Sequence, residues 1–425
     1  MFVRANGRLN DPPPVERAPI GMLPAGSKTI ARVLAGDLCS GCGLCASLSK
    51  SAMQSDSKGY HRPGKAPPVD SRMERLFAES CPGSRVAAWQ EAPHSDPYWG
   101  PWHQVMTGYA ADEGVRFRAS SGGAITALAL HALNSGLVDA VLHVHGDTLR
   151  PTRNCVTLSR TSEEVIAGAG SRYAASSPLE QIEQLLSAPG RFAFVGKPCD
   201  CSALRQFGKY DPRVADKIPL VFSFFCAGIP SASGARKILS KLGVDEEELA
   251  EFRYRGHGWP GRATAITHDS RSVDMSYEES WGEFLSKEVQ FRCKICPDAV
   301  GGVADIACAD AWYGGETGYP TFDELPGRSL IMSRTATGDR FLRDAISAGG
   351  VFAEPLASEE VALMQPSQAH RKRLIAARMA ALYSTFQPAT RVAGVMVAAA
   401  ASRAGIIEMA KNFLGTLRRI LTGRR

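Results

Sequence analysis

Three cysteines at two-residue gaps, Cys39, Cys42 and Cys45, constrain this chain more than any other feature of its 425 residues. Thiolates at this spacing wrap a loop around an iron–sulfur cube, and the small residues between them let backbone N–H groups turn toward the sulfurs. A bacterial ferredoxin run continues with a fourth Cys and then Pro, but Ser49 and Lys50 occupy those places. We therefore predict that the fourth ligand lies elsewhere in the chain.

The sequence SCPG at 80–83 provides that ligand, because Cys81 is followed by Pro as in ferredoxin motifs. In two-cluster ferredoxins the local fourth Cys binds the neighbouring cluster, so Ser49 removes the neighbour's ligand and not this cluster's. Zinc also accepts four thiolates, and a zinc knuckle, a three-iron cluster or an unoccupied remnant are the alternatives. The favoured prediction is a [4Fe–4S] cluster on Cys39, Cys42, Cys45 and Cys81.

Four more cysteines form a looser second group. Cys199 and Cys226 each follow a predicted strand, and ligands collect at such strand ends in an open α/β sheet. Cys293 and Cys296 form C-x2-C, so these four residues are candidates for a second four-thiolate site. Cys201 is close enough in sequence to substitute for Cys199.

The remaining thiols have no assigned role. The alternative for Cys155, Cys201 and Cys308 is that each is a buried, inert side chain.

Composition indicates a globular protein in a reducing compartment. The N-terminal residues contain no apolar region typical of a secretion signal, so eleven cysteines indicate metal or redox sites and a cytoplasmic protein. No run of 18 apolar residues predicts a membrane span. Apolar residues make up 44% and charged residues 22%, which suits two or three domains.

The net charge of +6 is concentrated at the C-terminus. Residues 371–425 contain eleven Lys or Arg and one Glu, which leaves the first 370 residues at about −4, so no nucleic-acid binding is expected. A tail over 391–425 is expected to dock on the body or a partner protein, or to lie peripherally on the inner membrane face. It places on one helical stripe Ile406, Ile407, Met409, Ala410, Phe413, Leu414, Leu417, Ile420 and Leu421.

Helix and strand patterns alternate through the middle of the chain, which predicts an α/β (α+β) fold. Helices are expected at 120–136, 178–187 and 231–243, and strands at 137–146, 191–199 and 218–226. Neither a Walker A sequence nor G-x-G-x-x-G is present, so a standard Rossmann dinucleotide fingerprint is excluded.

The expected domains follow from these patterns. A flexible arm covers 1–35, a ferredoxin-like [4Fe–4S] module covers 36–90, and a linker covers 91–104. A mixed α/β domain is divided into 105–185 and 186–362, and a basic helical tail covers 363–425.

At this point the chain resembles the beta subunit family of coenzyme F420-reducing hydrogenase and its dehydrogenase relatives. The family also includes ferredoxin-dependent chlorophyll-pigment reductases. Over roughly residues 36–345 the resemblance is carried, in the family's order, by FRASSGGAITALALHALNSGLVDAV, GSRYAASSP, FVGKPCDCSALRQF, FFCAGIPS, FRYRGHGWPG and RCKICPDAVGGVADIACADAWYGG.

The resemblance implies a flavin enzyme with FAD and one or two [4Fe–4S] clusters. The family's internal cluster ligands match Cys199, Cys226, Cys293 and Cys296, whereas only some members carry the N-terminal cluster. The family's FAD site matches Ser120, Ser121, Gly122, Gly123, Ser171, Arg172, Tyr173, Gly196 and Lys197.

These matches agree with the chemistry of the residues. A Ser/Gly turn that opens a helix offers N–H groups to a diphosphate, and Arg172 can pair with a phosphate. Lys197 would place positive charge near a reduced flavin ring, although relatives often have a small or hydroxyl residue there. The alternatives are an ordinary capped helix start and a solvated lysine.

The leading hypothesis is an iron–sulfur flavoprotein oxidoreductase. It would pass electrons between a ferredoxin-like one-electron carrier and an organic hydride donor or acceptor, either an F420-type deazaflavin or a small-molecule biosynthetic intermediate. F420 itself comes only with the family name. The alternatives are a non-catalytic electron-relay subunit of a larger complex and a zinc-stabilised binding protein.

No acid or base is assigned from the sequence. His257 and Trp259 are candidates for the substrate side, against a packed Gly-rich turn as the alternative. Asp298 and Asp310 flank the C-x2-C hairpin and are expected to be turn or capping residues.

Overall fold

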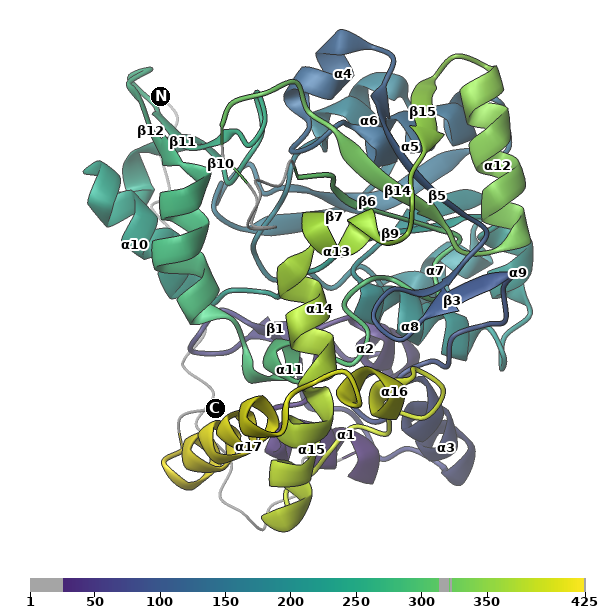
Figure 1. Cartoon of the computed structure of the whole chain (residues 1–425), viewed down its shortest axis with the longest axis vertical. Helices are drawn as coiled ribbons and strands as arrows, with labels where there is room; N and C mark the ends of the chain where they lie inside the picture. The colour runs from purple at the N-terminus through teal and green to yellow at the C-terminus, as the bar shows by residue number, and fades with distance from the viewer. Residues whose placement is uncertain (1–25, 313–320, 322, 424–425) are drawn as a thin grey trace, which may run out of the picture.

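The fold is built on an eight-stranded mixed sheet with the order β15-β5-β14-β13-β9-β8-β6-β7 (Figure 1). A computed structural model describes residues 26–312, 321 and 323–423. Strands β13, β9, β8 and β6 run parallel, whereas the outer strands are antiparallel to their neighbours. The bounds are β5 Gln104–Ala110, β6 Ala140–Gly146, β7 Asn154–Ser159, β8 Phe192–Val195, β9 Val221–Phe224, β13 Ile306–Asp310, β14 Ser329–Ser333 and β15 Val351–Pro355.

Helices cover both faces of this sheet. Side chains alternate between the faces, so Val141 packs in the core with α5 (Ala124–Asn134), while its neighbour Leu142 packs in the core with α8 (Pro198–Phe207). Burial on both faces explains why the parallel strands read as continuous apolar runs. The predicted α/β class is confirmed.

The antiparallel half of the sheet contains the main errors of prediction. The sequence patterns do not predict strands β5, β14 and β15, and the linker prediction for 91–104 is wrong. Those residues form β3 (His94–Asp96) and β4 (Gly100–Trp102), which pair with each other. Trp99 between them is buried, and the nearby Pro101 carbonyl accepts a 2.9 Å hydrogen bond from Arg334, so this segment belongs to the body.

A second, three-stranded antiparallel sheet lies to one side. It consists of β10 (Leu249–Arg253), β11 (Arg262–Thr267) and β12 (Ser272–Ser276), and α10 (Ala232–Leu242) packs on it. Gly243, at φ +67°, ends α10 as predicted, but the Ser231 hydroxyl bonds to Glu288 and does not cap the helix. The predicted helix at 178–187 is shorter than expected, since α7 covers Ile182–Ser187.

The first cysteines lie in a small module that is docked against the sheet domain. Its elements are α2 (Leu44–Ser49), the hairpin of β1 (Met53–Ser55) and β2 (His61–Pro63), and α3 (Ser71–Ser80). The Cys42 carbonyl accepts a 2.9 Å hydrogen bond from Leu179 N. Gly43 has φ +90° and lies so close to Glu180 that a Cβ added to it would lie 2.6 Å from the Glu180 backbone nitrogen.

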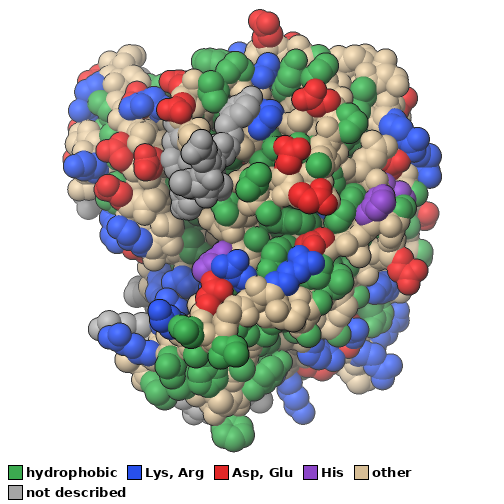
Figure 2. Space-filling model, in the orientation of Figure 1, with side chains coloured by type: hydrophobic (Ala, Val, Ile, Leu, Met, Phe, Trp, Pro, Cys, Tyr) green, Lys and Arg blue, Asp and Glu red, His purple; other side chains and the backbone are tan. Residues whose placement is uncertain are grey.

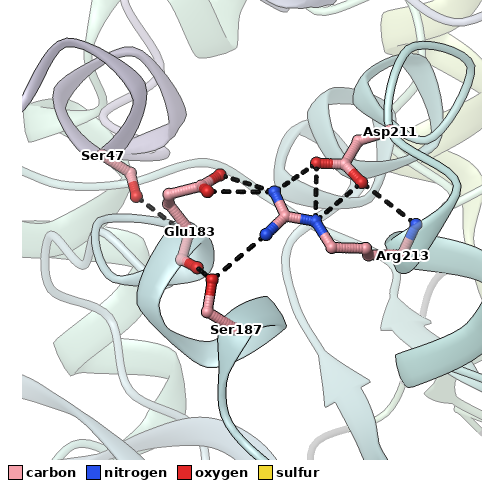
Figure 3. Close-up of polar contacts among 5 residues, drawn as sticks. All are labelled: Ser47, Glu183, Ser187, Asp211 and Arg213. Atoms are coloured by element: carbon pink, nitrogen blue, oxygen red, sulfur yellow. Dashed lines mark hydrogen bonds and ion pairs between the residues drawn. The ribbon is translucent and has the colours of Figure 1, made fainter.

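A polar network fixes α2 to the sheet domain (Figure 3). The Ser47 hydroxyl accepts a 3.1 Å hydrogen bond from Glu183 N at the start of α7. Arg213 then donates to the Glu183 carboxylate at 2.9 Å and to the Asp211 carboxylate at 2.6 Å (Figure 3). Because these side chains are partly exposed, the network contributes more to the orientation of α2 on the sheet domain than to the stability of the protein.

The predicted flexible arm at 1–35 is wrong where the structure describes it. Residues Lys28–Ala35 form α1, with Ser27 as a capping residue, and Val33 is buried. Residues 1–25 lie outside the described residues. The helix forms because its apolar side chains pack on helices from the other end of the chain.

The predicted basic tail at 363–425 is helical, but it is part of the body. It forms α13 (Glu360–Met364), α14 (Pro366–Arg373), α15 (Ile375–Ser384), α16 (Val397–Ala401) and α17 (Ile406–Leu421). Figure 1 shows α15, α16 and α17 at the same end of the molecule as α1 and α3. Ile375 and Met379 of α15 share a core with Val33, Leu38 and Cys39, so these helices complete the cysteine module.

Helix α17 uses only part of its apolar stripe for this packing. Ile420 is buried, and Phe413 and Leu417 pack beside it, whereas Ile407 and Leu421 are 73% and 74% exposed. Hydrophobic side chains gather on this end of the molecule in Figure 2. None of the described helices is long and apolar enough to cross a membrane. The contact of 391–425 with a membrane surface or partner protein stays a prediction.

Two neighbouring residues of α17 test this packing. We expect Ile420→Ala to lower the free energy of unfolding by about 2 kcal/mol, because it removes a buried side chain from the edge of a core. Leu421→Ala is the matched control and is expected to change it by less than about 0.5 kcal/mol. Equal effects in thermal denaturation would show that α17 is not docked on α15.

Candidate functional site

The structure brings together the first cysteine group, defined as Cys39, Cys42, Cys45 and Cys81. Three of them lie in and before α2, and Cys81 follows α3. Burial and then the other three thiols raise the pKa of Cys45 well above its usual value. Burial and then Cys39 raise the pKa of Cys81 to about 11. Four mutually close thiols, two on buried and two on half-buried residues, would suit a site whose ligands lose protons when metal binds.

The second cysteine group, defined as Cys199, Cys226, Cys293 and Cys296, is also assembled. Burial and then Cys293 raise the pKa of Cys226 to about 12, and Arg371 opposes this shift. Burial and then Asp200 raise the pKa of Cys199, and Lys197 opposes it. Lys197 and Arg371 therefore place positive charge close to the sulfurs of the second group, which would balance the charge of thiolates.

Helix α14 closes over the second group. Arg371 donates to the carbonyl oxygens of Cys226 and Cys293 at 3.0 and 2.9 Å. Lys372, which is buried, donates to the Pro297 and Val395 carbonyls. Part of the basic charge counted in the C-terminal region is thus used inside the protein.

Zinc and a four-iron cluster require different spacings of their four thiolates. Among the described residues, no three Cys, His, Asp or Glu side chains could hold one ion together. A zinc ion at about 2.3 Å from each sulfur would draw its thiolates to within about 4 Å of one another. In a four-iron cluster each thiolate binds its own iron, so the ligands stand further apart.

The other thiols do not replace these ligands. Cys201 is fully buried, and its thiol faces the carbonyls of Gly196 and Phe222 in the sheet core. Cys308 is also buried, as expected. Cys155 is exposed, so the alternative of a buried thiol is wrong there.

A cavity of about 430 Å³ adjoins the second group. It lies at the carboxyl ends of the parallel strands, and Cys226 forms part of its wall. Two buried acceptors on the wall, Asp200 Oδ1 and Gln368 Oε1, have no hydrogen-bond partner among the described residues. The volume is in the range of small-molecule and cofactor sites, and the two free acceptors suit a ligand with N–H or O–H groups.

The predicted Ser/Gly turn reaches this cavity. Ser120, Ser121 and Gly123 line it, and α5 begins directly after Gly123, which has φ +77°. Both hydroxyls already have protein partners, since Ser120 Oγ accepts from Ser171 N and Ser121 Oγ donates to the Arg328 carbonyl. Gly122 is not on the wall; an added Cβ would lie 2.6 Å from the Gly108 carbonyl oxygen, so the sheet requires this glycine.

The other predicted flavin residues, Ser171, Arg172, Tyr173, Gly196 and Lys197, also line the cavity. The Arg172 guanidinium donates to Asn154 Oδ1 and to the carbonyls of Phe252, Pro151 and Arg153. Four of its five N–H groups are thus committed to holding β7 and β10, which leaves little capacity for a phosphate.

Lys197 is buried, so the alternative of a solvated side chain is wrong. Its Nζ lies 2.7 Å from Asp200 Oδ2 and also donates to Ser176. Burial acts to lower the pKa of Lys197, but the Asp200 carboxylate outweighs it and raises the pKa. The lysine therefore contributes a fixed charge to the wall of the cavity, and Asp200 partly balances it.

Asp310 proves to be a pocket residue. Its carboxylate accepts two 2.8 Å hydrogen bonds from the buried Arg255 and one from Trp259 Nε1. Trp259 stacks on Trp312 in the protein interior, which matches the packed-turn alternative. His257, at φ +55°, stacks on Phe117 and is not on the cavity wall, whereas Asp298 accepts backbone N–H groups in a turn as expected.

Sequence reasoning missed a histidine pair. His143 lines the cavity, and its Nε2 lies 2.7 Å from Ser159 Oγ and 3.1 Å from His145 Nε2. Burial and then His145 lower the pKa of His143 to about 3, so it is neutral. The signal was present as H-x-H in the predicted strand, because residues two apart share one face.

Comparison with known proteins begins with two models of one family. The model for the N-terminal part of the coenzyme F420 hydrogenase/dehydrogenase beta subunit matches residues 105–183, and the model for its C-terminal part matches residues 190–359. Together they span more than half of the chain. The matched ranges include the second cysteine group and the cavity residues named above up to Asp310, whereas the first cysteine group lies outside them.

Individual relatives are distant. The beta subunit of coenzyme F420 hydrogenase from Methanothermobacter thermautotrophicus is 27% identical over 62% of this chain and 87% of that subunit. The beta subunit of F420-dependent formate dehydrogenase from Methanocaldococcus jannaschii is 27% identical over 54% of this chain and 59% of that subunit. The chloroplastic 7-hydroxymethyl chlorophyll a reductase of Oryza sativa is 26% identical over 55% of this chain and 46% of its own length.

A solved structure has the same fold. A chain of the F420-reducing [NiFe] hydrogenase complex from Methanosarcina barkeri superposes with a TM-score of 0.51 and 21% identity. The match covers 68% of this chain and 96% of that chain.

Proposed function

The chain belongs to the coenzyme F420 hydrogenase/dehydrogenase beta subunit family, and we propose that it is an oxidoreductase holding FAD and two [4Fe–4S] clusters. It would carry electrons between a ferredoxin-like or F420-type carrier and a small-molecule hydride donor or acceptor. The position of Cys226 carries this proposal, because this cysteine belongs to the second group and also lines the cavity. A cluster on that group would adjoin a flavin in the cavity.

The cysteine pattern favours clusters over zinc. Both groups contain four thiols, as a four-iron cluster requires, and the C-x2-C-x2-C spacing of the first group with a Cys-Pro partner is typical of clusters. A flavin exchanges hydride with organic molecules and single electrons with clusters, so the two kinds of group together connect two-electron and one-electron chemistry.

The cavity residues have separable roles in this proposal. Ser120, Gly123 and Tyr173 shape the wall, Lys197 supplies positive charge, and the free acceptors of Asp200 and Gln368 would receive ligand hydrogens. The pair of His143 and His145 connects the cavity wall to a partly exposed side chain, which provides a route for the proton that accompanies electron-pair transfer.

Cofactor content tests the proposal directly. Purified without oxygen, the full chain is expected to contain about eight irons, about four for each cluster, and one flavin. Iron, sulfide and zinc analysis together with the flavin absorption band measure this. A zinc-loaded protein without iron or flavin would contradict the proposal and support the zinc-stabilised binding protein.

An electron-relay subunit is the second candidate, because the named relatives include hydrogenase and formate dehydrogenase subunits. A relay would hold the same cofactors but leave the organic substrate to a partner. Oxidation of chemically prepared reduced F420 by the isolated chain, with an artificial electron acceptor, would support the enzyme. Full cofactor content without turnover of reduced F420 favours the relay or a different substrate.

A further inference from the structure

Arg292 connects the two cysteine groups. It lies in α11 (Phe291–Lys294), immediately before Cys293, and it is 2% exposed. Its Nη2 donates a 2.9 Å hydrogen bond to the carbonyl oxygen of Pro82, the residue after Cys81. A side chain from the second group's hairpin therefore reaches the backbone of the first group.

The guanidinium interacts electrostatically with thiols on both sides. On the side of the second group it faces Cys199, Cys293 and Cys296, and on the side of the first group it faces Cys81. An arginine stays protonated in proteins, so this is a permanent positive charge between two sets of potential thiolates. Burial keeps screening by water and salt small.

Two of its nitrogens have no oxygen or nitrogen acceptor. Arg292 Nε and Nη1 are buried and lack such a partner in the described part of the chain, and the acceptor offered to the guanidinium there is the thiol of Cys296. Leaving buried charged N–H groups without acceptors is costly, and native proteins rarely do so. Cluster sulfides and thiolates are anionic acceptors that would remove this cost.

We propose that Arg292 is a cation shared by the two clusters, and that it makes both of them easier to reduce. This inference rests on the proposed function, since it requires both clusters. Reduction adds one electron to a cluster without breaking a bond, so it increases the negative charge beside the guanidinium. A fixed buried cation stabilises that added charge on either side. Both potentials rise together, so the difference between them is changed little.

Three substitutions test the inference in the full-length protein purified without oxygen. Arg292→Gln removes the charge but keeps an amide donor for Pro82, and Arg292→Lys keeps the charge without the planar fork. Arg371→Gln is the matched control, because Arg371 donates to the backbone of Cys226 and Cys293 in the second group and acts on the Cys226 thiol. Redox titration followed by EPR reports the potential of each cluster.

We expect Arg292→Gln to shift both clusters to more negative potential, each by about tenfold in the one-electron equilibrium constant, or about 59 mV. Arg292→Lys is expected to shift both by less, and Arg371→Gln to shift only one. A glutamine variant in which either cluster keeps its wild-type potential would overturn the inference, as would equal shifts for lysine and glutamine.

Iron content separates the possible failures. A wild-type chain without two clusters would contradict the proposed function and not the role of Arg292 alone. If Arg292→Gln loses iron, retention of iron by Arg292→Lys would support the need for the charge. Loss of iron in both variants would show that the fork, and not the cation, is required, and this would overturn the inference.

Discussion

Cys81→Ala is expected to remove one of the two proposed clusters and to leave the flavin bound. Cys81 is the member of the first group that comes from outside the 39–45 loop, and it lies at the end of α3. The cavity wall contains no residue of α3 or of the 39–45 loop. Iron in the protein purified without oxygen is therefore expected to fall from about eight to about four per chain, with unchanged flavin content.

Cys201→Ala is the control for this substitution. Cys201 is buried like the ligands, but its thiol faces carbonyl groups of the sheet core, so iron content is expected to stay at the wild-type value. Two results would contradict the ligand assignment: unchanged iron in Cys81→Ala, or loss of flavin together with iron. The EPR signal of a three-iron cluster would instead agree with Cys81 as the ligand of the fourth iron, because three thiolates remain.

The cysteine groups could be predicted because their information is local. Cys39, Cys42 and Cys45 have a spacing that matches cluster geometry within seven residues, and Cys199 and Cys226 follow strands that apolar runs reveal. Parallel neighbours then place those strand ends at one edge. Spacing made Cys199, Cys226, Cys293 and Cys296 a candidate site, family resemblance favoured it, and the structure places all four together.

The rest of the site depends on contacts that no local pattern encodes. Arg292 is one basic residue among many in the sequence, and only the fold places it against Pro82. In the sequence, Arg371 and Lys372 read as part of a basic helical tail, yet they donate hydrogen bonds around the second group. Counting charges along a sequence cannot distinguish basic side chains that are buried and hydrogen-bonded to the backbone from those on an exposed surface.

The predicted flavin residues illustrate a different limit. All of them except Gly122 line one cavity, and their contact with a flavin stays a prediction. The number of N–H groups that Arg172 has free for a ligand could not be predicted, because its acceptors come from residues 151–154 and from Phe252. Similarly, Asp310 has the sequence context of a turn residue, and its partner Arg255 lies 55 positions away.

That pair gives the second large prediction. Asp310→Asn is expected to destabilise the protein by about 3 kcal/mol, because it removes the countercharge of a buried arginine. The Arg255 side chain is 2% exposed and that of Asp310 is 19% exposed, with both Nη atoms of the arginine bonded to the carboxylate. In the variant the guanidinium keeps its charge and its Pro260 contact, but only aromatic rings and a neutral amide oppose that charge.

The matched control is Asp274→Asn, which removes the partner of Arg262 from an exposed ion pair on the small sheet. An exposed ion pair contributes about 0–1 kcal/mol to stability, so the thermal midpoint of Asp274→Asn should stay near that of the wild type. Asp310→Asn should lower the midpoint by several degrees. It should also weaken flavin retention, because Asp310 and Arg255 both line the cavity. Equal midpoints for the two variants would contradict this prediction, because the buried Arg255–Asp310 pair would then contribute no more stability than the exposed Arg262–Asp274 pair. The stacking of Trp259 on Trp312 would then be the remaining candidate for what fixes this side of the cavity.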